Sequence, residues 1–533
     1  MGLNQSNHSI DKFTSQLSAH IWGHRFKEGQ RGPEYVLEFL NVLYGTDYNF
    51  DAIEYKQRKS VSLRKFIFQG VKEGSVRDIV TLQDAELEKL KETFPDENNL
   101  TVLRKFLRSL EVELYNLNGE EADRSWYART LYPLHESLLF FELRKKESSQ
   151  MMIERNFFAR GGELYFLMLA YGTEENDGQR RFIEERFREL LNKNKMIYRV
   201  VESIQSSLGE KEGHVDDKFS KLRSSIQNEE NVPYLPDTRM PIFKDFADEL
   251  ALLLQNDVEI YELFRLLVSL VCFQLTRYMH VRAQDVGDNN LLYFFDCLDG
   301  LNTHVTQLSA QTFKEHENLI KKRFEKEFER KYREAIGNTD SVNEKLIEWK
   351  NDTDAFFKRL GLDKLRTAKK VIESVLKSCD SENDLYGRLY DVVKDVVSNR
   401  LKKDQLNITR VLTRDGGLAT YRRGSGVNYR YTISDTFIQS LVFTMVGPGN
   451  KMEFHAFLDQ IYQRFGVVIG EVQARQSGLY ERSRLNVRYF QENEKALREK
   501  LRRNGLLVEY SDATAMIRNP YSPVKRMEEV GYA

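Results

Sequence analysis

Hydrophobic residues recur at spacings of three and four along most of this chain. A clear instance is the set Phe454, Phe457, Leu458 and Ile461, which falls on one face of an α-helix. Strand signals with a period of two are sparse before residue 407. The pattern therefore predicts a mainly α-helical protein made of several helical bundles. In the first part of the chain, helices are expected over residues 33–44, 80–92, 100–114, 122–144, 150–171 and 178–199, with an interruption or kink at Pro133.

The most apolar helices are expected in the middle of the chain. Ile260, Leu263, Leu266, Leu267 and Leu270 leave little polar surface on any side of the predicted helix. A helix that is hydrophobic all round is buried all round. We therefore expect this helix to be central in its domain.

The hydrophobic period changes to two after residue 407. Short runs at 408–412, 418–421 and 427–432 are separated by glycine-containing turns, which predicts a small antiparallel β meander. The second turn carries Arg422 and Arg423. This basic loop could lie against a phosphate backbone, or it could simply be exposed.

Residues 434–519 follow the order of elements of a winged-helix module. Helices are predicted over 434–446, 451–465 and 491–504, and each is followed by a glycine. Two strand-like runs, 506–510 and 515–518, come next and are joined by a polar tip. This order makes the third helix the candidate recognition helix.

The predicted third helix has a basic outward face. If Leu497 and Leu501 point inward at 100° per residue, then Glu499 and four cations point outward. Such a face suits a phosphate backbone, although winged helices also serve as protein-docking modules. The predicted nucleic-acid contacts are Lys495, Arg498, Arg502 and Arg503 of this helix, Arg422 and Arg423 of the loop, and Arg518 of the last strand.

These patterns divide the chain into four segments. We expect an N-terminal helical domain over 1–208, a linker over 209–237 and a central helical domain over 238–406. The C-terminal domain, 407–533, combines the meander with the winged-helix-like module. The linker is predicted from its polar, Gly- and Pro-containing composition, and a short helix over 215–226 stays open.

Charge is distributed unevenly between the two ends. The whole chain has a formal net charge of −1, but residues 401–533 hold 21 Lys and Arg against 14 Asp and Glu. The remainder is correspondingly acidic. A basic C-terminal part favours contact with a polyanion there and a protein partner elsewhere.

Cysteine usage and hydropathy bear on the compartment. Cys272, Cys297 and Cys379 lie far apart and define neither a disulfide framework nor a zinc spacing. Residues 1–8 are polar, and charged residues interrupt the most apolar stretch, 263–281. We therefore expect no signal peptide, no membrane contact and a cytoplasmic location.

A search for catalytic chemistry gives no candidate. Residues 447–451 have the glycines of a phosphate loop but follow a helix, so we interpret them as a turn. His20 and His24 have ligand spacing without a third ligand. Gly161 and Gly162 lie in an apolar run, which favours close helix packing. We expect no catalytic residues, no metal site, no cofactor and a non-enzymatic role, although a site assembled from distant residues stays open.

Two stretches resemble a known group of proteins. Residues 22–26 (Trp-Gly-His-Arg-Phe) with 29–30 and 35–40, and residues 155–164, resemble accessory proteins of bacterial anti-phage defence operons. The nearest group is the large non-catalytic subunits that accompany ATPases in modification-dependent restriction. The resemblance implies a partner ATPase or nuclease, with DNA as the shared ligand.

We therefore predict a DNA-associating, non-catalytic subunit of an antiviral defence complex of the restriction type. It would contact DNA, without strong sequence preference, through the C-terminal winged helix. Two alternatives stay open: a protein-binding scaffold whose winged helix docks a partner ATPase or nuclease, and a nuclease with an unrecognised active site.

Overall fold

The computed structural model describes most of the chain. The described residues are 17–24, 26, 29–59, 61–71, 79–115, 120–121, 126, 129–139, 143–145, 151–153, 160–209, 214–223, 232, 234–285, 290–336, 405–421, 429–510 and 514–524, with scattered positions between 347 and 391. Helices dominate these residues and the sheets have two or three strands, so the mainly α prediction is confirmed.

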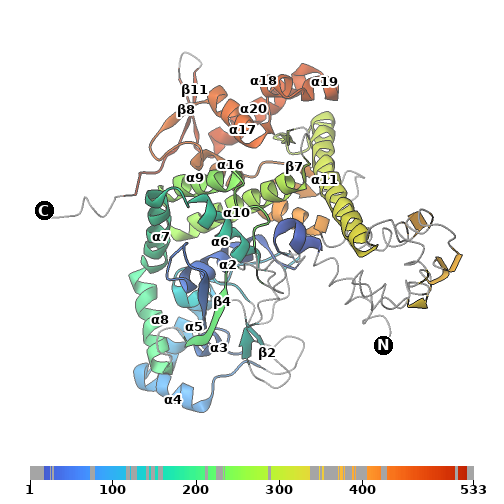
Figure 1. Cartoon of the computed structure of the whole chain (residues 1–533). Helices are drawn as coiled ribbons and strands as arrows, with labels where there is room; N and C mark the ends of the chain where they lie inside the picture. The colour runs from blue at the N-terminus through green and yellow to red at the C-terminus, as the bar shows by residue number, and fades with distance from the viewer. Residues whose placement is uncertain are drawn as a thin grey trace.

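The N-terminal part is a group of helices with two short strand pairs, drawn in blue to green in Figure 1. Its helices are α2 (Gly32–Gly45), α3 (Val61–Ile67), α4 (Asp84–Thr93), α5 (Glu97–Arg108), α6 (Gly161–Gly172), α7 (Asp177–Asn192) and α8 (Lys195–Leu208). Strand β1 (Glu54–Lys59) pairs antiparallel with β4 (His214–Lys221), and β2 (Leu143–Lys145) with β3 (Met151–Ile153).

Helices α2 and α6 approach each other closely at a pair of glycines. A Cβ atom added to Gly162 would lie 2.5 Å from the backbone nitrogen of Phe39. The backbone N–H of Gly162 donates to Glu38 Oε2 at 2.6 Å. The interpretation of Gly161 and Gly162 as packing residues is therefore confirmed.

The sequence misplaced several elements in this part. Met151–Ile153, expected within the helix over 150–171, form strand β3 instead. The helix expected over 122–144 is wrong in its described portion, which includes a short 3₁₀ turn (Glu136–Leu138) and strand β2. Pro133 lacks the N–H that a helix interior needs. The predicted linker includes β4, because pairing with the distant strand β1 supplies its backbone hydrogen bonds.

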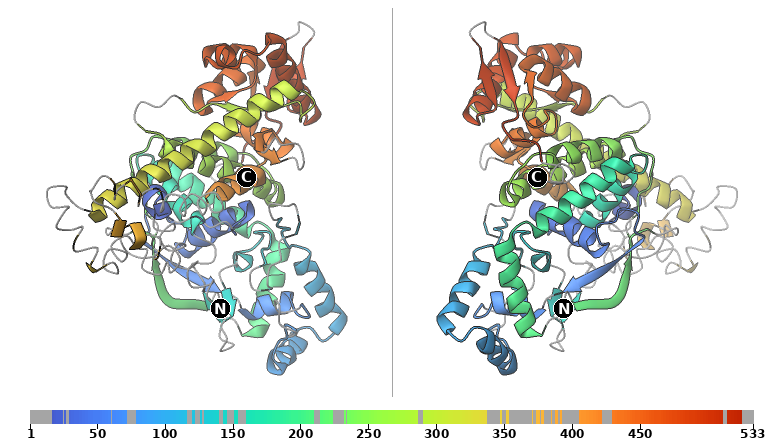
Figure 2. Two further views of the ribbon diagram at one scale, coloured as in Figure 1. Left: turned by 90° about the vertical axis from the view of Figure 1, so that its right-hand side faces the viewer. Right: turned by 90° about the vertical axis from the view of Figure 1, so that its left-hand side faces the viewer.

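The middle of the chain forms the centre of the molecule. It contains α9 (Ile242–Leu254), α10 (Ile260–Ala283), the short strand β5 (Tyr293–Phe294) and α11 (Thr303–Ile336). Helix α10 is buried on nearly every side, as its sequence predicted. Figure 2 shows α11 in yellow, running from beside the C-terminal helices down the side of the molecule.

Two of the three strands predicted for the meander form. Residues 405–415 are helical, so the strand expected over 408–412 is wrong. Its β-branched residues favour a strand locally, but Leu406, Ile408, Val411 and Leu412 are all buried, and tertiary packing overrides a weak propensity. Two strands do form, β6 (Ala419–Tyr421) and β7 (Tyr429–Tyr431), and they pair antiparallel.

The C-terminal part lies at the top of Figure 1, in orange to red. Its elements are α16 (Asp435–Phe443), β8 (Lys451–Glu453), α17 (Phe454–Phe465), β9 (Val467–Val468), α18 (Glu471–Gln476), α19 (Leu479–Ser483), α20 (Val487–Arg503), β10 (Leu507–Glu509) and β11 (Ala515–Arg518). Strands β10, β11 and β8 form one antiparallel sheet in that order, and β9 pairs in parallel with β5 of the middle part.

Apolar packing is continuous across the predicted boundaries. One cluster of buried side chains extends from Leu17 to Ile517 and includes residues of all three predicted domains. The division of the chain into domains stays a prediction. None of the described helices combines the length and the apolarity needed to cross a bilayer.

Candidate nucleic-acid interface

Helix α20 begins one turn earlier than its sequence suggested. Asn486 caps it, because its side-chain oxygen accepts the backbone N–H of Arg488 at 2.9 Å. Asparagine is a favoured capping residue, so this signal was present in the sequence. The earlier start adds the exposed Arg488 to the helix.

The inward face of α20 is the one that the leucine spacing predicted. Leu497 and Leu501 are both 0% exposed. Phe490 continues this seam toward the helix start and packs edge-to-face on Phe294 of β5. The orientation of the helix is therefore fixed by burial of one apolar side, which leaves the opposite side to solvent.

Two of the predicted contacts extend from α20 without internal partners. Lys495 and Arg503 are exposed, and neither makes a hydrogen bond or ion pair with another residue that the structure describes. A ligand could therefore meet these two charges without displacing a hydrogen bond or ion pair among the described residues.

Arg502 and Arg498 are placed differently. The Arg502 guanidinium forms ion pairs with Glu509 of β10 and with Glu499 of its own helix. The hydrogen bond that Arg502 donates to Glu509, and then the one that it donates to Glu499, raise the pKa of Arg502. Arg498 is half-buried, with its guanidinium carbon 4.8 Å from the centre of the Phe454 ring, a cation–π contact with α17. Both side chains link α20 to neighbouring elements.

The remaining predicted residues lie at the edges of this face or outside it. Arg518 is exposed at the end of β11, and its Nε donates to the carbonyl of Gly505 at 2.9 Å. Arg422 and Arg423 lie outside the described residues. The structure thus brings Lys495, Arg498, Arg502, Arg503 and Arg518 onto one module.

Acidic residues are interspersed with these cations. Arg488 pairs with Glu492 at 2.8 Å, one helical turn further along α20. Glu499 and Glu509 contact Arg502 as described. The outward face of α20 is therefore basic on balance but carries both signs of charge.

The stretches that carry the defence-protein resemblance come together in the interior. The Glu38 carboxylate accepts Nε2 of Gln30 at 2.9 Å and the backbone N–H of Gly162 at 2.6 Å, and the Gln30 and Glu38 side chains are buried. Among the residues that the structure describes, no three His, Cys, Asp or Glu side chains are grouped as a metal site requires. Burial raises the pKa of the Cys272 thiol well above its usual value, which disfavours the reactive thiolate.

Comparison with known proteins identifies no relative of this chain. No family model, no curated protein and no solved structure matches the chain.

Proposed function

We propose that this protein is a DNA-associating, non-catalytic subunit that contacts the phosphate backbone through the outward face of α20. The observation that carries the proposal is the combination, on one helix, of a fully buried leucine seam with exposed, unengaged cations at Lys495 and Arg503. Neutralising phosphates supplies most of the affinity in sequence-independent binding. Contacts to phosphates carry no direct sequence information, so little sequence preference is expected.

The arrangement around α20 supports a winged-helix interpretation. Strand β8 lies between α16 and α17, α20 precedes β10 and β11, and these strands form a three-stranded antiparallel sheet. In helix-turn-helix proteins the recognition helix enters the major groove, and α20 occupies the corresponding place in the order. Helices α18 and α19 stand between the second and third helices, which departs from the simplest form of the motif.

A binding titration tests the proposal. The full-length chain is titrated with labelled duplex DNA of unrelated sequences at several salt concentrations. The logarithm of the binding constant should fall linearly with the logarithm of salt, by about 0.9 for each phosphate neutralised. Binding that is absent, or that does not respond to salt, contradicts the proposal.

A second candidate function is docking of a protein partner on the same face. The observation that favours it is the pairing of Arg488 and Arg502 with glutamates, since a surface of mixed charge suits a complementary protein surface. The resemblance to defence-operon proteins suggests an ATPase or nuclease as that partner. Recovery of a stoichiometric partner from the native host, together with no salt-dependent DNA binding, would favour this function.

A further inference from the structure

The inner face of α20 is attached to the middle of the chain by polar contacts as well as apolar ones. The Asn493 side chain is buried, and its oxygen accepts the backbone N–H of Cys297 at 2.8 Å. Its amide group donates to the carbonyls of Phe295 at 2.9 Å and Ile469 at 3.1 Å. One carboxamide therefore joins α20 to two separate segments of backbone.

A second attachment lies two turns further along the same face. Lys500 is only 7% exposed, and its ammonium group contacts both carboxylate oxygens of Asp299 at 2.8 Å. The same group donates to the carbonyl of Ile433 at 3.3 Å. A buried ammonium needs such partners, because removing an unpaired charge from water is costly. Lys500 thus stabilises the packing of α20, whereas Lys495 is exposed to solvent.

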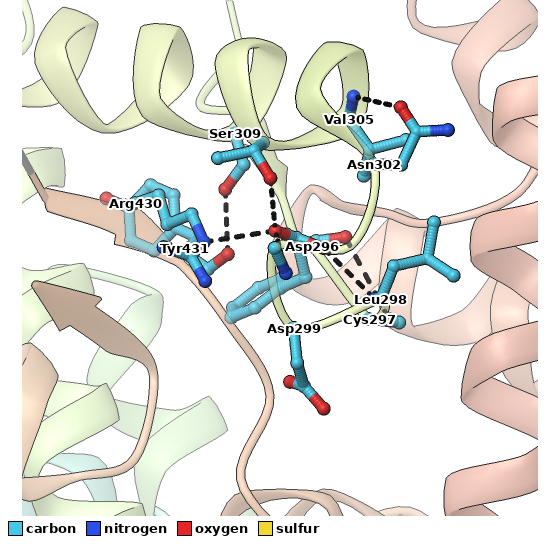
Figure 3. Close-up of polar contacts among 12 residues, drawn as sticks. Asp296, Cys297, Leu298, Asp299, Asn302, Val305, Ser309, Arg430 and Tyr431 are labelled. Carbon is cyan, nitrogen blue, oxygen red and sulfur yellow. Dashed lines mark hydrogen bonds and ion pairs between the residues drawn. The ribbon is translucent and has the colours of Figure 1, made fainter. Parts of the chain in front are cut away.

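Both attachments reach the same short loop, residues 296–300, here called the clamp loop. The side chain of Asp296 accepts hydrogen bonds from the backbone of this loop and from neighbouring elements, as Figure 3 shows. This carboxylate is completely buried and accepts the backbone N–H groups of Leu298 and Gly300, each at 3.0 Å. It also accepts Oγ1 of Thr306 at 2.9 Å and Nε of Arg430 at 3.0 Å, which ties the loop to α11 and β7.

The backbone of the clamp loop directs Asp299 toward α20. Asp299 has a φ of 54°, a left-handed conformation that few residues other than Gly, Asn and Asp adopt readily. Such a conformation persists only where surrounding contacts determine it, and the hydrogen bonds to Asp296 provide them here. The hydrogen bonds within the clamp loop therefore orient the Asp299 carboxylate independently of its contact with Lys500.

We infer that the clamp loop positions α20 for its ligand, with Asp299, Asn493 and Lys500 as positioning residues that do not themselves contact DNA. The inference rests on the proposed function where it concerns DNA, but the attachment of α20 can be tested separately. A helix fixed in this way presents Lys495 and Arg503 at set positions relative to α11 and β7. Preorganisation of this kind lowers the entropy lost on binding.

The substitution Asp299→Asn separates positioning from simple electrostatics. Asparagine keeps the size of the side chain and tolerates the left-handed backbone, while the ion pair with Lys500 is lost. Electrostatics alone predicts tighter DNA binding, because a partly exposed negative charge near the basic face is removed. A positioning role of Asp299 predicts weaker DNA binding instead. Glu481→Gln is the matched control, since it removes one exposed carboxylate from α19 of the same module.

Two measurements on the full-length chain are compared between these variants. Hydrogen–deuterium exchange of the α20 amides should be faster in Asp299→Asn than in Glu481→Gln or the wild type. DNA affinity should fall by roughly three- to tenfold in Asp299→Asn, with an unchanged salt slope because no phosphate contact is removed.

Unchanged exchange of α20 in Asp299→Asn overturns the inference, whatever the affinity. Faster exchange with equal or tighter DNA binding overturns the positioning role. If the wild type does not bind DNA, the proposed function fails, and the exchange measurement alone still decides whether the clamp loop holds α20.

Discussion

Arg502 at the end of α20 and Glu509 on β10 form an ion pair, with 2.5 Å between Nη2 and Oε2. The pair connects the proposed recognition helix to the strand that follows it. A phosphate that approaches Arg502 must compete with this carboxylate, whereas one that approaches Lys495 meets no internal partner among the described residues. The outward cations of α20 are therefore not equivalent.

We first predict that the double substitution Lys495→Ala, Arg503→Ala weakens DNA binding without unfolding the protein. If each side chain contacts one phosphate, the slope of log K against log salt should fall by nearly two. Stability should change by less than about half a kcal/mol for each substitution, because both side chains are exposed.

The matched control for that experiment is Lys105→Ala, Lys244→Ala, which removes two exposed lysines from α5 and α9. The control should keep the wild-type slope. Equal slopes for the folded α20 variant and the wild type would remove α20 from the DNA-contacting surface and favour the docking function.

Glu509→Gln should strengthen DNA binding. The substitution releases Arg502 from one of its two carboxylate partners and removes a negative charge beside the basic face. Exposed ion pairs contribute only about 0–1 kcal/mol, so the fold should tolerate the change. Fluorescence anisotropy at low salt measures the effect, and a weaker complex would indicate that the Arg502–Glu509 pair shapes the interface.

Leu501→Ala should destabilise the protein by about 2–5 kcal/mol, because the leucine is completely buried and its truncation leaves a cavity. Leu301→Ala is the matched control, since Leu301 is 88% exposed and its loss should be nearly neutral. Urea denaturation of both variants measures the difference. Similar stabilities would contradict the inward orientation of Leu501.

Gly162→Ala should destabilise the contact between α2 and α6. The added methyl group would lie 2.5 Å from the backbone nitrogen of Phe39, and overpacking of this kind typically costs about 1–3 kcal/mol. Gly178→Ala is the control, because its nearest neighbour would be 3.7 Å away at the start of α7. A thermal melt in which both variants match the wild type would contradict the close approach of the two helices.

The last prediction concerns two buried histidines in the centre of the molecule. His316 of α11 contacts the Tyr431 hydroxyl through Nδ1 at 2.6 Å, and His280 of α10 contacts the Tyr293 hydroxyl at 2.8 Å. Burial lowers the pKa of His316 to about 3. Burial, and then the neighbouring His316, lowers the pKa of His280 well below its usual value. Both imidazoles are therefore neutral in the folded protein at neutral pH.

The sign of the pH dependence follows from those shifts. Below about pH 6.5 the unfolded chain binds protons at both histidines and the folded protein does not, so stability is present at neutral pH and lost on acidification. The free energy of unfolding should fall by up to about 1.4 kcal/mol per pH unit for each histidine. Urea denaturation between about pH 7 and pH 5 measures this slope. His316→Gln, which does not titrate there, should reduce the slope by the contribution of one histidine, and an unchanged slope would contradict the assignment.

Local sequence determined the helices whose burial repeats with the helical period. The apolar positions of 260–281 and 451–465 predicted α10 and α17, although Lys451–Glu453 form strand β8. The spacing of Leu497 and Leu501 predicted the buried side of α20. These predictions succeeded because periodicity is a property of neighbouring residues, and burial of an apolar face decides helix orientation.

Tertiary structure decided the elements that depend on distant partners. Strand β4 forms inside the predicted linker because β1, far away in sequence, offers it hydrogen-bonding groups. Residues 408–412 became helical because their surroundings bury them on most sides, although β-branched residues favour strands. No local pattern contains that information.

The two lysines of α20 show the same division most plainly. Lys495 and Lys500 are chemically identical and belong to one helix, yet the first is exposed and the second is a buried attachment point. Helical periodicity places Lys500 away from the outward face. Only the folded chain brings Asp299, 201 residues away in sequence, to within 2.8 Å of its ammonium group, and that non-local contact decides which charge serves the fold and which remains available to a ligand.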